Sequence, residues 1–245
     1  MLEKAQKMLE KHPLCNHCLG RQFALLGHGI DNEKRGEALK LLLTMKAHQT
    51  ALSKNKAGVA LLKILASNGN YPMAAEMLRN MKHKPTEAPQ CSLCQGRLES
   101  VERLANHALG RLKEYEYKTL LVGVKLPVEI EEREDELKGE FTVTHGESLR
   151  NEFSRNIGKK LVEATKKQIE YERPDIVVLM DPFTEQMSLQ INPLHIGGRY
   201  RKLVRDIPQS RWLCGNCRGK GCKKCNWTGK MYPESVEEII GQSAL

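Results

Sequence analysis

Apolar residues recur every three or four positions through most of the first half of the chain, with Gly, Asn or Pro between the runs. This spacing is typical of amphipathic helices. It is found in the segments 1–12, 33–48, 56–67 and 71–83, and again in 96–116. The stretch KHKPTEAPQ (82–90) interrupts it and predicts a loop. Residues 1–112 are therefore predicted to form a helical domain.

The pattern changes at Thr119. TLLVGVKLPVEI has the leucine and β-branched content of a buried strand, and the acidic EIEEREDELKGE (129–140) after it predicts a solvated loop. A helix is expected next, within 146–172, because apolar residues recur there every four positions; these are Leu149, Phe153, Ile157 and Leu161.

Two short strands, 174–181 and 186–193, are predicted around the turn DPFTEQ. In the second strand Met187, Leu189 and Ile191 alternate with polar residues, which predicts one buried and one wet face. Further on, SVEE (235–238) has the spacing of a capping box and predicts a helix start.

The order of these elements predicts an α+β protein: a helical N-terminal part, an α+β domain and a small cysteine-rich knot. The expected boundaries are 1–112, 113–210 and 211–232, and 233–245 would be a linker or the beginning of a further helix. No internal repeat and no low-complexity segment changes this division.

Composition narrows the class of partner. The 39 Lys and Arg against 30 Asp and Glu give a net charge of +9, and a polyanion is the simplest partner for such an excess. Aromatic residues are only 5% of the chain, which argues against a large single-strand stacking platform and favours recognition of backbone and shape. No apolar stretch is long enough for a membrane span and the opening segment has no apolar signal core, so we expect a cytoplasmic protein without membrane contact.

All eight cysteines fall in four CxxC pairs, which are Cys15/Cys18, Cys91/Cys94, Cys214/Cys217 and Cys222/Cys225. Two such pairs complete a tetrahedral four-thiolate site of the kind that zinc prefers. The last two pairs are close enough in sequence to close one site locally. The first two pairs are far apart, and if they share a second ion they join the first helix to the loop before the fifth. Other pairings of the four units stay open, and we expect zinc, in two ions.

Other roles for the cysteines are disfavoured. An iron–sulfur cluster accepts four cysteines, but the spacings differ from the common ferredoxin runs. A thioredoxin-type redox pair needs a βαβ setting that none of the four pairs has. His12 and His17 flank the first pair and are alternative ligands, although with eight thiolates present they are expected to be surface histidines.

Ten basic residues and one acid lie between Arg199 and Lys230. Part of this charge offsets a zinc–thiolate site, and the rest predicts a phosphate-binding surface rather than a merely solvated charge run. Gly197 and Gly198 would let the backbone approach RNA closely. Trp212 and Trp227 either pack over the cysteine knot or stack on bases. The predicted RNA contacts are Arg199, Arg201, Lys202 and Arg205, together with Lys159 and Lys160 on the basic helix.

Two stretches carry a resemblance to a known family. The run INPLHIGGRYRKLVRDIPQSRWLCGNCRGKGCKKCNWTGKMYPESVEEIIG and the early HPLCNHCLGRQFALLGHG resemble archaeal members of the tenth family of tRNA pseudouridine synthases, which modifies T-arm uridines at tRNA positions 54 and 55. The resemblance implies a THUMP domain that grips the acceptor end of tRNA. It also implies that Cys15, Cys18, Cys91 and Cys94 are zinc ligands; the assignment of Cys214, Cys217, Cys222 and Cys225 rests mainly on their spacing.

The family's catalytic aspartate, in a motif of the form GRExxDxR, has no counterpart. The five aspartates, Asp31, Asp135, Asp175, Asp181 and Asp206, all lie in other settings. The chain is therefore expected to bind tRNA and to be inactive alone, as a fragment, a truncated copy or one half of a split enzyme with a separate catalytic chain. The alternative is a stand-alone zinc-containing RNA-binding or ribosome-associated protein. A metal-dependent hydrolase is unsupported, because no HExxH motif and no open metal position is present.

Overall fold

The computed structural model describes residues 1–193 and 199–243. The chain divides into two compact units, Met1–Pro193 and Leu194–Leu245, and each is described by itself. Within the described residues, no helix combines the length and the apolar character that a membrane crossing requires.

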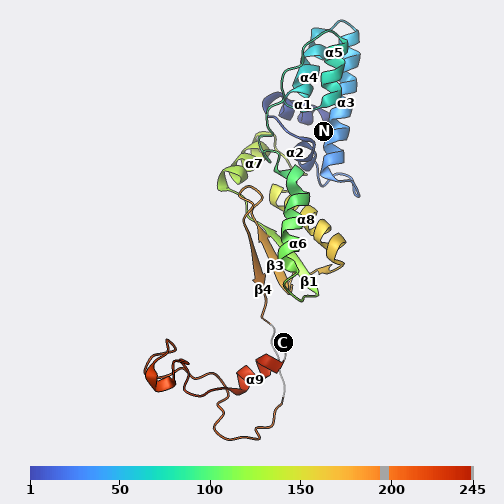
Figure 1. The fold of residues 1–245 in the computed structure, drawn as a ribbon. Coiled ribbons are helices and arrows are strands. Elements are labelled where there is room, and N and C mark those ends of the chain that lie inside the picture. The colour runs from blue at the N-terminus through green and yellow to red at the C-terminus, as the bar shows by residue number, and fades with distance from the viewer. Residues whose placement is uncertain (194–198, 244–245) are drawn as a thin grey trace. The chain divides into compact units, whose positions relative to one another are not determined.

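The N-terminal part of the first unit is helical, as the periodicity predicts (Figure 1). Its helices are α1 (Leu2–Lys11), α2 (Asn16–Arg21), α3 (Asn32–Leu52), α4 (Lys56–Ala66) and α5 (Pro72–Asn80). Helix α3 packs against both α2 and α4, and α4 packs against α5. The shared core includes Leu43, Leu62 and Leu65, none more than 1% exposed. Burial of each such side chain stabilises the fold by about 1.5–3 kcal/mol.

Helix α2 lies directly on α3 because small residues stand where the two helices meet. A Cβ added to Gly20 would lie 1.9 Å from the carbonyl oxygen of Asn32, and one added to Gly36 would lie 1.9 Å from that of Asn16. Only glycine permits this approach of one backbone to the other. The contact fixes α2, which follows Cys15, against the longest helix of the unit.

The rest of the first unit is a four-stranded sheet with helices. After η1 (Arg97–Ser100) and α6 (Val101–Leu112) come β1 (Thr119–Val124), α7 (Val128–Glu140), α8 (Leu149–Thr165), β2 (Gln168–Ile169), β3 (Ile176–Met180) and β4 (Met187–Ile191). The strand order is β2-β1-β3-β4; β1 runs parallel to β2 and β3, and β3 pairs antiparallel with β4. The expected α+β class is confirmed.

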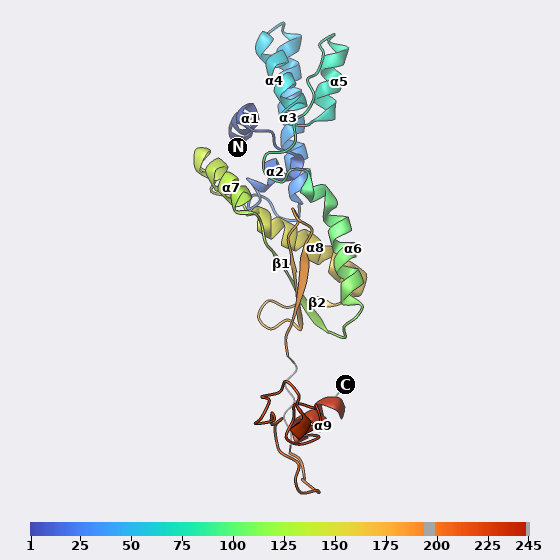
Figure 2. The same cartoon turned by 60° about the vertical axis from the view of Figure 1, so that its left-hand side comes forward.

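Helix α8 packs against β1, and α6 packs against α8 (Figure 2). Alternate residues of β1 and β3 are buried, and they pair in register as Leu120 with Ile176, Val122 with Val178 and Val124 with Met180. The residues predicted to face the core from α8, namely Leu149, Phe153, Ile157 and Leu161, are all completely buried. The intervening positions of β1 and β3 are half-buried, so one face of β1 lies in the core as the strand prediction requires and the other face is partly exposed.

Two predictions about this region are wrong. The acidic segment 129–140 is not a solvated loop but helix α7, because Ile130, Glu134 and Leu137 share one face and are buried. Strand β4 has no fully buried face: Met187 and Leu189 are half-buried, and Ile191 is 49% exposed. As an edge strand paired only with β3, β4 lies at the margin of the core.

The second unit is organised around the last two CxxC pairs. An isolated antiparallel bridge joins Leu213 to Lys230, and the short η2 (Lys223–Cys225) lies between them in sequence. Helix α9 (Val236–Ser243) follows, and its capping box is formed: the Glu238 amide donates to Ser235 Oγ at 3.2 Å and the Ser235 amide to Glu238 Oε2 at 3.1 Å. The predicted helix start is confirmed.

Candidate metal centres and nucleic-acid interface

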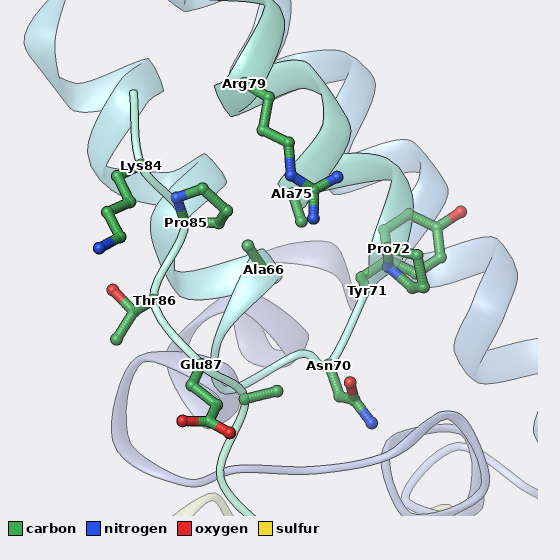
Figure 3. Close-up of a pocket in the computed structure, with 11 residues that line it drawn as sticks. Ala66, Asn70, Tyr71, Pro72, Ala75, Arg79, Lys84, Pro85, Thr86 and Glu87 are labelled. Carbon is green, nitrogen blue, oxygen red and sulfur yellow. The ribbon is translucent and has the colours of Figure 1, made fainter. Parts of the chain in front are cut away.

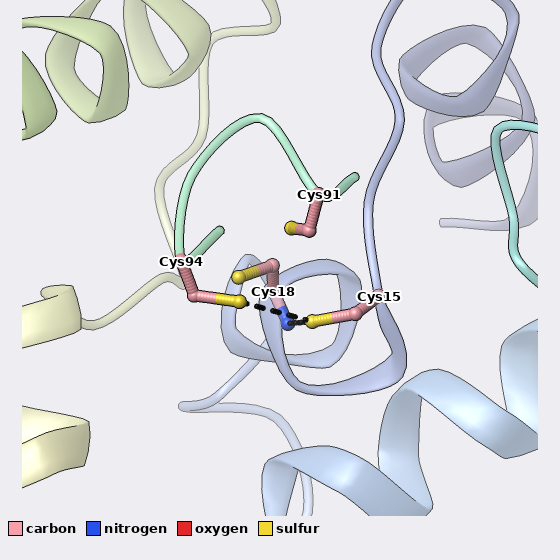
Figure 4. Close-up of side chains that lie close together, drawn as sticks. All are labelled: Cys15, Cys18, Cys91 and Cys94. Atoms are coloured by element: carbon pink, nitrogen blue, oxygen red, sulfur yellow. Dashed lines mark hydrogen bonds between the residues drawn. The ribbon is translucent and has the colours of Figure 1, made fainter. Parts of the chain in front are cut away.

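The first two CxxC pairs meet although they are far apart in sequence (Figure 4). The four Sγ atoms of Cys15, Cys18, Cys91 and Cys94 all lie within 4.8 Å of one another, and Cys15 Sγ is 3.5 Å from Cys94 Sγ. The last two pairs form a second group of the same kind, with Cys214, Cys217, Cys222 and Cys225 also within 4.8 Å of one another. The structure therefore selects one of the pairings that the sequence leaves open.

The spacing of the sulfurs fits a tetrahedral metal site. A zinc ion with four Zn–S bonds of about 2.3 Å requires S–S edges of about 3.8 Å. In the second group the Cys214–Cys222, Cys217–Cys225 and Cys222–Cys225 Sγ separations are 3.9, 3.7 and 3.7 Å. All eight cysteines are free thiols in the structure. Both groups can therefore hold a metal ion by four thiolates, which leaves no ligand position open.

Local backbone geometry prepares the first group for this role. Cys15 is the N-cap of α2, and its Sγ accepts the amide of Cys18 at 3.5 Å. Thiolates at a helix N-terminus are favoured by the helix dipole. After Cys94 the chain turns sharply through Gln95 and Gly96, both at positive φ, so that η1 begins immediately. The metal position therefore joins α2 to the turn before η1 and α6, and not α1 as the sequence predicts.

A buried arginine lies beside the first group. Arg21 is completely buried; its Nη1 donates to Glu152 Oε2 at 2.9 Å and lies 3.5 Å from Cys18 Sγ, while Nε donates to Glu134 Oε1 at 3.0 Å. Burial alone would raise the pKa of Glu152, but a hydrogen bond with His17 and the charge of Arg21 hold it below its usual value. Arg21 thus connects the cysteine group to both α7 and α8.

A second cation, Lys40 of α3, is also completely buried. Its Nζ donates to the carbonyl oxygens of Leu14 at 2.8 Å and Gly69 at 2.6 Å, and to Asn16 Oδ1 at 2.8 Å. Burial lowers the pKa of Lys40 to about 8, against the opposing influence of the nearby cysteine thiolates. Two cations beside four thiolates suit a zinc complex with two net negative charges.

The two histidines near the first pair have carboxylate partners. His12 Nε2 lies 2.8 Å from Glu140 Oε2, and His17 Nδ1 lies 3.0 Å from Glu152 Oε1. Burial lowers the pKa of His17, but Glu152 and Glu33 outweigh it, so that the pKa is raised above 6.5. Neither histidine is in the metal-binding group. His17 is not the surface residue that the sequence predicts, since its side chain is only 19% exposed.

The carboxylates that bind Arg21, Glu134 and Glu152, are not among the functional residues predicted from the sequence. Glu134 stands between Ile130 and Leu137 on the buried face of α7, and Glu152 stands beside Phe153 on the buried face of α8. Such carboxylates can be found in a sequence because they stand at a core position of an amphipathic helix. A buried acid is retained in a fold only when it is paired, so a carboxylate at such a position predicts a buried cationic partner.

The two tryptophans of the second unit differ in their surroundings. Trp212 packs edge-on against Tyr232, with 6.0 Å between ring centroids. Trp227 is 71% exposed, so it does not roof the cysteine group. Among the cysteines, the Asn216 side-chain amide donates to Cys222 Sγ, and this hydrogen bond lowers the pKa of Cys222 to about 6.

The residues predicted to contact RNA fall in both units. All four from the basic run of the second unit, Arg199, Arg201, Lys202 and Arg205, are exposed. Gly197 and Gly198, which were expected to allow close approach, lie outside the described residues. Lys159 and Lys160 are on α8, and each has an acidic partner: Lys159 Nζ is 2.9 Å from Asp31 Oδ1, and Lys160 Nζ is 2.8 Å from Glu102 Oε2.

A hollow of about 790 Å³ lies between α5 and the segment 84–88 (Figure 3). Arg79 extends beside Ala75 on the α5 side of the hollow, and Lys84 and Glu87 line the opposite side. No cysteine and no histidine lines the hollow.

The mixed α+β fold and the two groups of four cysteine thiols define the chain as an α+β protein with two candidate metal-binding sites. A family model described as "Pus10 THUMP domain, archaeal" matches residues 104–181, which include most of α6 and all of β1, α7, α8, β2 and β3. The chain is 43% identical to the tRNA pseudouridine synthase Pus10 of Methanocaldococcus jannaschii and 36% identical to that of Methanopyrus kandleri, each over 98% of this chain. The Pyrococcus furiosus enzyme of the same name is 37% identical over 86% of it.

The chain spans about half the length of the curated relatives it matches: 52%, 53% and 45% of these three proteins. The chain corresponds to an N-terminal part of the Pus10 family. The resemblance stated from the cysteine-rich runs is confirmed.

Proposed function

We propose that this chain is the tRNA-binding module of a Pus10-type pseudouridine synthase, which positions a T-arm uridine for isomerisation. The observation that supports this most is the THUMP match over 104–181, which contains α8 and three of the four strands of the sheet, β1, β2 and β3. A role in tRNA modification would place the chain in the cytoplasm, in contact with tRNA.

Both thiolate groups are proposed to hold zinc in a structural role. Four thiolates fill the tetrahedral coordination of zinc, so the ion would supply folding energy and no reacting water. In the first unit Cys15 and Cys18 would hold α2 beside the turn that carries Cys91 and Cys94. In the second unit the ion would organise a segment in which Cys214 is buried and Cys217, Cys222 and Cys225 are half-buried.

RNA contact is proposed for the basic run and for α8. Arg199, Arg201, Lys202 and Arg205 are exposed, and none has a carboxylate within ion-pair distance among the residues that the structure describes. Phosphate contacts of this kind set affinity and register without reading base identity. Lys159 and Lys160 would exchange their exposed acidic partners for phosphate, at small cost since exposed pairs stabilise by about 0–1 kcal/mol.

Catalysis is proposed to require residues that this sequence does not contain. None of the five aspartates occurs in a GRExxDxR motif. Asp175, for example, accepts the amides of Lys118 and Thr119 and so has a structural role at the start of the sheet. We therefore expect no pseudouridine from this chain alone, and pseudouridine when a separate chain bearing the catalytic aspartate is added.

The test is a titration of the zinc-loaded chain with unmodified tRNA and with an RNA duplex of similar length, each over a series of salt concentrations. Tighter binding to tRNA that persists near physiological salt is the expected result. Equal and steeply salt-dependent binding to both RNAs would contradict shape-specific recognition. Mass spectrometry of the tRNA for pseudouridine, with and without the second chain, tests the catalytic part separately.

A matched pair of variants tests the contact residues. Replacing Arg199 and Arg201 with alanine should weaken tRNA binding and reduce the slope of log K against log salt by about 1.5, since each lost phosphate contact removes about 0.7–0.9. Replacing Lys54 and Lys56, exposed at the start of α4, removes the same charge elsewhere. If both double variants changed the slope equally, the effect of Arg199 and Arg201 would be a general effect of net charge, and the assignment of these residues as specific RNA contacts would be refuted.

A further inference from the structure

The second unit presents one aromatic side chain in an unusual way. Trp227 has φ of +64°, and Asn226 before it has φ of +50°. Asparagine adopts the left-handed region readily, but for a bulky residue such as tryptophan this conformation is strained and a clear outlier. Glycine is the residue that would relieve this strain, yet a tryptophan occupies the position. Such strain persists only where the surrounding structure imposes it.

The surrounding structure does impose it. The Trp227 amide donates to the Cys222 carbonyl at 2.9 Å, and the Asn226 amide donates to that of Lys223 at 3.3 Å. A Cβ on Gly221 would lie 2.9 Å from the Trp227 carbonyl oxygen, so the backbone is closely packed on that side. The turn that positions Cys222 and Cys225 therefore also fixes the Trp227 backbone.

The side chain of Trp227 nevertheless contributes little to the fold. It is 71% exposed, and it has no aromatic partner among the described residues. Trp212 provides the contrast, since it packs edge-on against Tyr232 beside the bridge that closes the unit. A strained backbone that holds a large apolar side chain in solvent indicates a binding role for that side chain.

The charges around Trp227 indicate what it binds. Residues 207–233 contain six basic residues and no acid; the basic ones are Arg211, Arg218, Lys220, Lys223, Lys224 and Lys230. Of these, only Lys230 has an acidic partner within the described part of the chain, namely Glu238. This excess is larger than the two negative charges of a four-thiolate zinc site. Lys223 and Lys224 form η2, immediately before the turn that carries Trp227.

We infer that Trp227 is a stacking platform for an unpaired base of RNA, with the neighbouring lysines and arginines holding the flanking phosphates. An indole ring stacks on any base, because every base has a π-face, and adjacent cations supply the affinity for the backbone. This inference rests on the proposed RNA-binding function and goes beyond phosphate contact, since it assigns a base-contacting residue to the second unit.

The two tryptophans make a direct test possible, because the chain contains no others. Trp212→Phe leaves Trp227 as the sole indole, and Trp227→Phe leaves Trp212. Tryptophan emission of each zinc-loaded full chain is recorded during titration with unmodified tRNA and with an RNA duplex. Stacking predicts strong quenching by tRNA in the Trp212→Phe protein and much weaker quenching in the Trp227→Phe protein. The duplex, which has no unpaired base, should quench Trp227 less than tRNA does.

Affinity provides a second readout that is independent of emission. Trp227→Ala should raise the Kd for labelled tRNA by about 5- to 150-fold, the range reported by alanine substitution at stacking positions. Zinc content should be unchanged, because the side chain is exposed. Trp212→Phe should keep the unsubstituted Kd.

The outcomes separate this inference from the function on which it rests. If tRNA binds but neither Trp227 emission nor the Trp227→Ala affinity changes, stacking is refuted and the proposed tRNA-binding function stands. If the unsubstituted chain does not bind tRNA, the proposed function itself is refuted. If Trp227 emission shifts instead on adding the remaining half of the Methanocaldococcus jannaschii relative without RNA, the residue belongs to a protein interface and stacking is refuted.

Discussion

Replacing Arg21 with methionine tests whether the buried ion network holds α2 to α7 and α8. The change would leave Glu134 and Glu152, which are 4% and 1% exposed, without their arginine. Removing one partner of a buried pair costs about 3–5 kcal/mol. Here His17 and Lys138 still contact the two carboxylates, at 3.0 and 3.4 Å, so we expect a loss of about 3 kcal/mol.

The free energy of unfolding would be measured by urea titration of the metal-loaded chain, followed by circular dichroism at the helix band. Metal content of the folded protein would be determined on the same samples. Arg103→Gln is the matched control: its guanidinium also binds a glutamate, Glu185, but the arginine is 63% exposed. This control should cost no more than about 0.5 kcal/mol.

A companion variant distinguishes charge from packing. Arg21→Met combined with Glu134→Gln and Glu152→Gln removes the unpaired charges and should recover most of the loss, because buried networks replaced as a whole are often neutral. A single Arg21→Met protein that loses less than about 1 kcal/mol would refute the reasoning. A triple variant that is less stable than the Arg21→Met protein would also refute it.

Three further predictions concern the sheet, the helix packing and the RNA surface. Asp175→Asn should cost no more than about 0.5 kcal/mol at neutral pH: backbone amides at the start of β1 donate to this carboxylate and lower its pKa, but the carboxylate is exposed and solvent screens the interaction. That stability is present above pH 4 and is lost as pH falls through the folded pKa, so the difference from the unsubstituted chain in urea titrations should shrink below about pH 4. Gly58→Ala should destabilise by about 1–3 kcal/mol, since the added Cβ would lie 2.4 Å from the backbone of α3; Gly110→Ala, with open space around it in α6, should instead stabilise by about 0.5–1 kcal/mol in thermal unfolding. Glu102→Gln should free Lys160 and tighten tRNA binding two- to fivefold in a salt titration, and unchanged binding would remove Lys160 from the RNA surface.

Most of the helices and the three longer strands, β1, β3 and β4, could be predicted from the sequence. Their apolar residues recur over several helical turns, or form strand-like runs of apolar residues. The segment of α8 is the clearest case, since Leu149, Phe153, Ile157 and Leu161 all reach the core. Helix α2 could not be predicted in this way, because six residues are too short for a period to show. Its stability comes from the Cys15 cap and from backbone contact with α3, both of which depend on the folded chain.

Helix α7 could not be predicted from the sequence either, because its charged residues obscure its apolar spacing. Acidic residues dominate 129–140, and the spacing of Ile130, Glu134 and Leu137 carries the helical pattern with a glutamate at its centre. That glutamate is buried only because Arg21 comes to it from a segment more than one hundred residues earlier. The cysteines show the same division: CxxC spacing identifies ligands, while the pairing of Cys15 and Cys18 with Cys91 and Cys94 is a property of the tertiary fold.

The two cysteine groups differ in when they can form during synthesis. More than seventy residues separate Cys18 from Cys91, so α1 to α5 emerge from the ribosome before the first group has all its ligands. Until Cys91 and Cys94 are synthesised, the contacts available to the segment of α2 are those with residues already made, such as the Lys40 hydrogen bonds to Leu14 and Asn16. The second group spans only 214–225 and can capture its ion within moments of emerging. The two candidate metal sites therefore differ in timing: the ligands of the first are synthesised far apart and those of the second almost together.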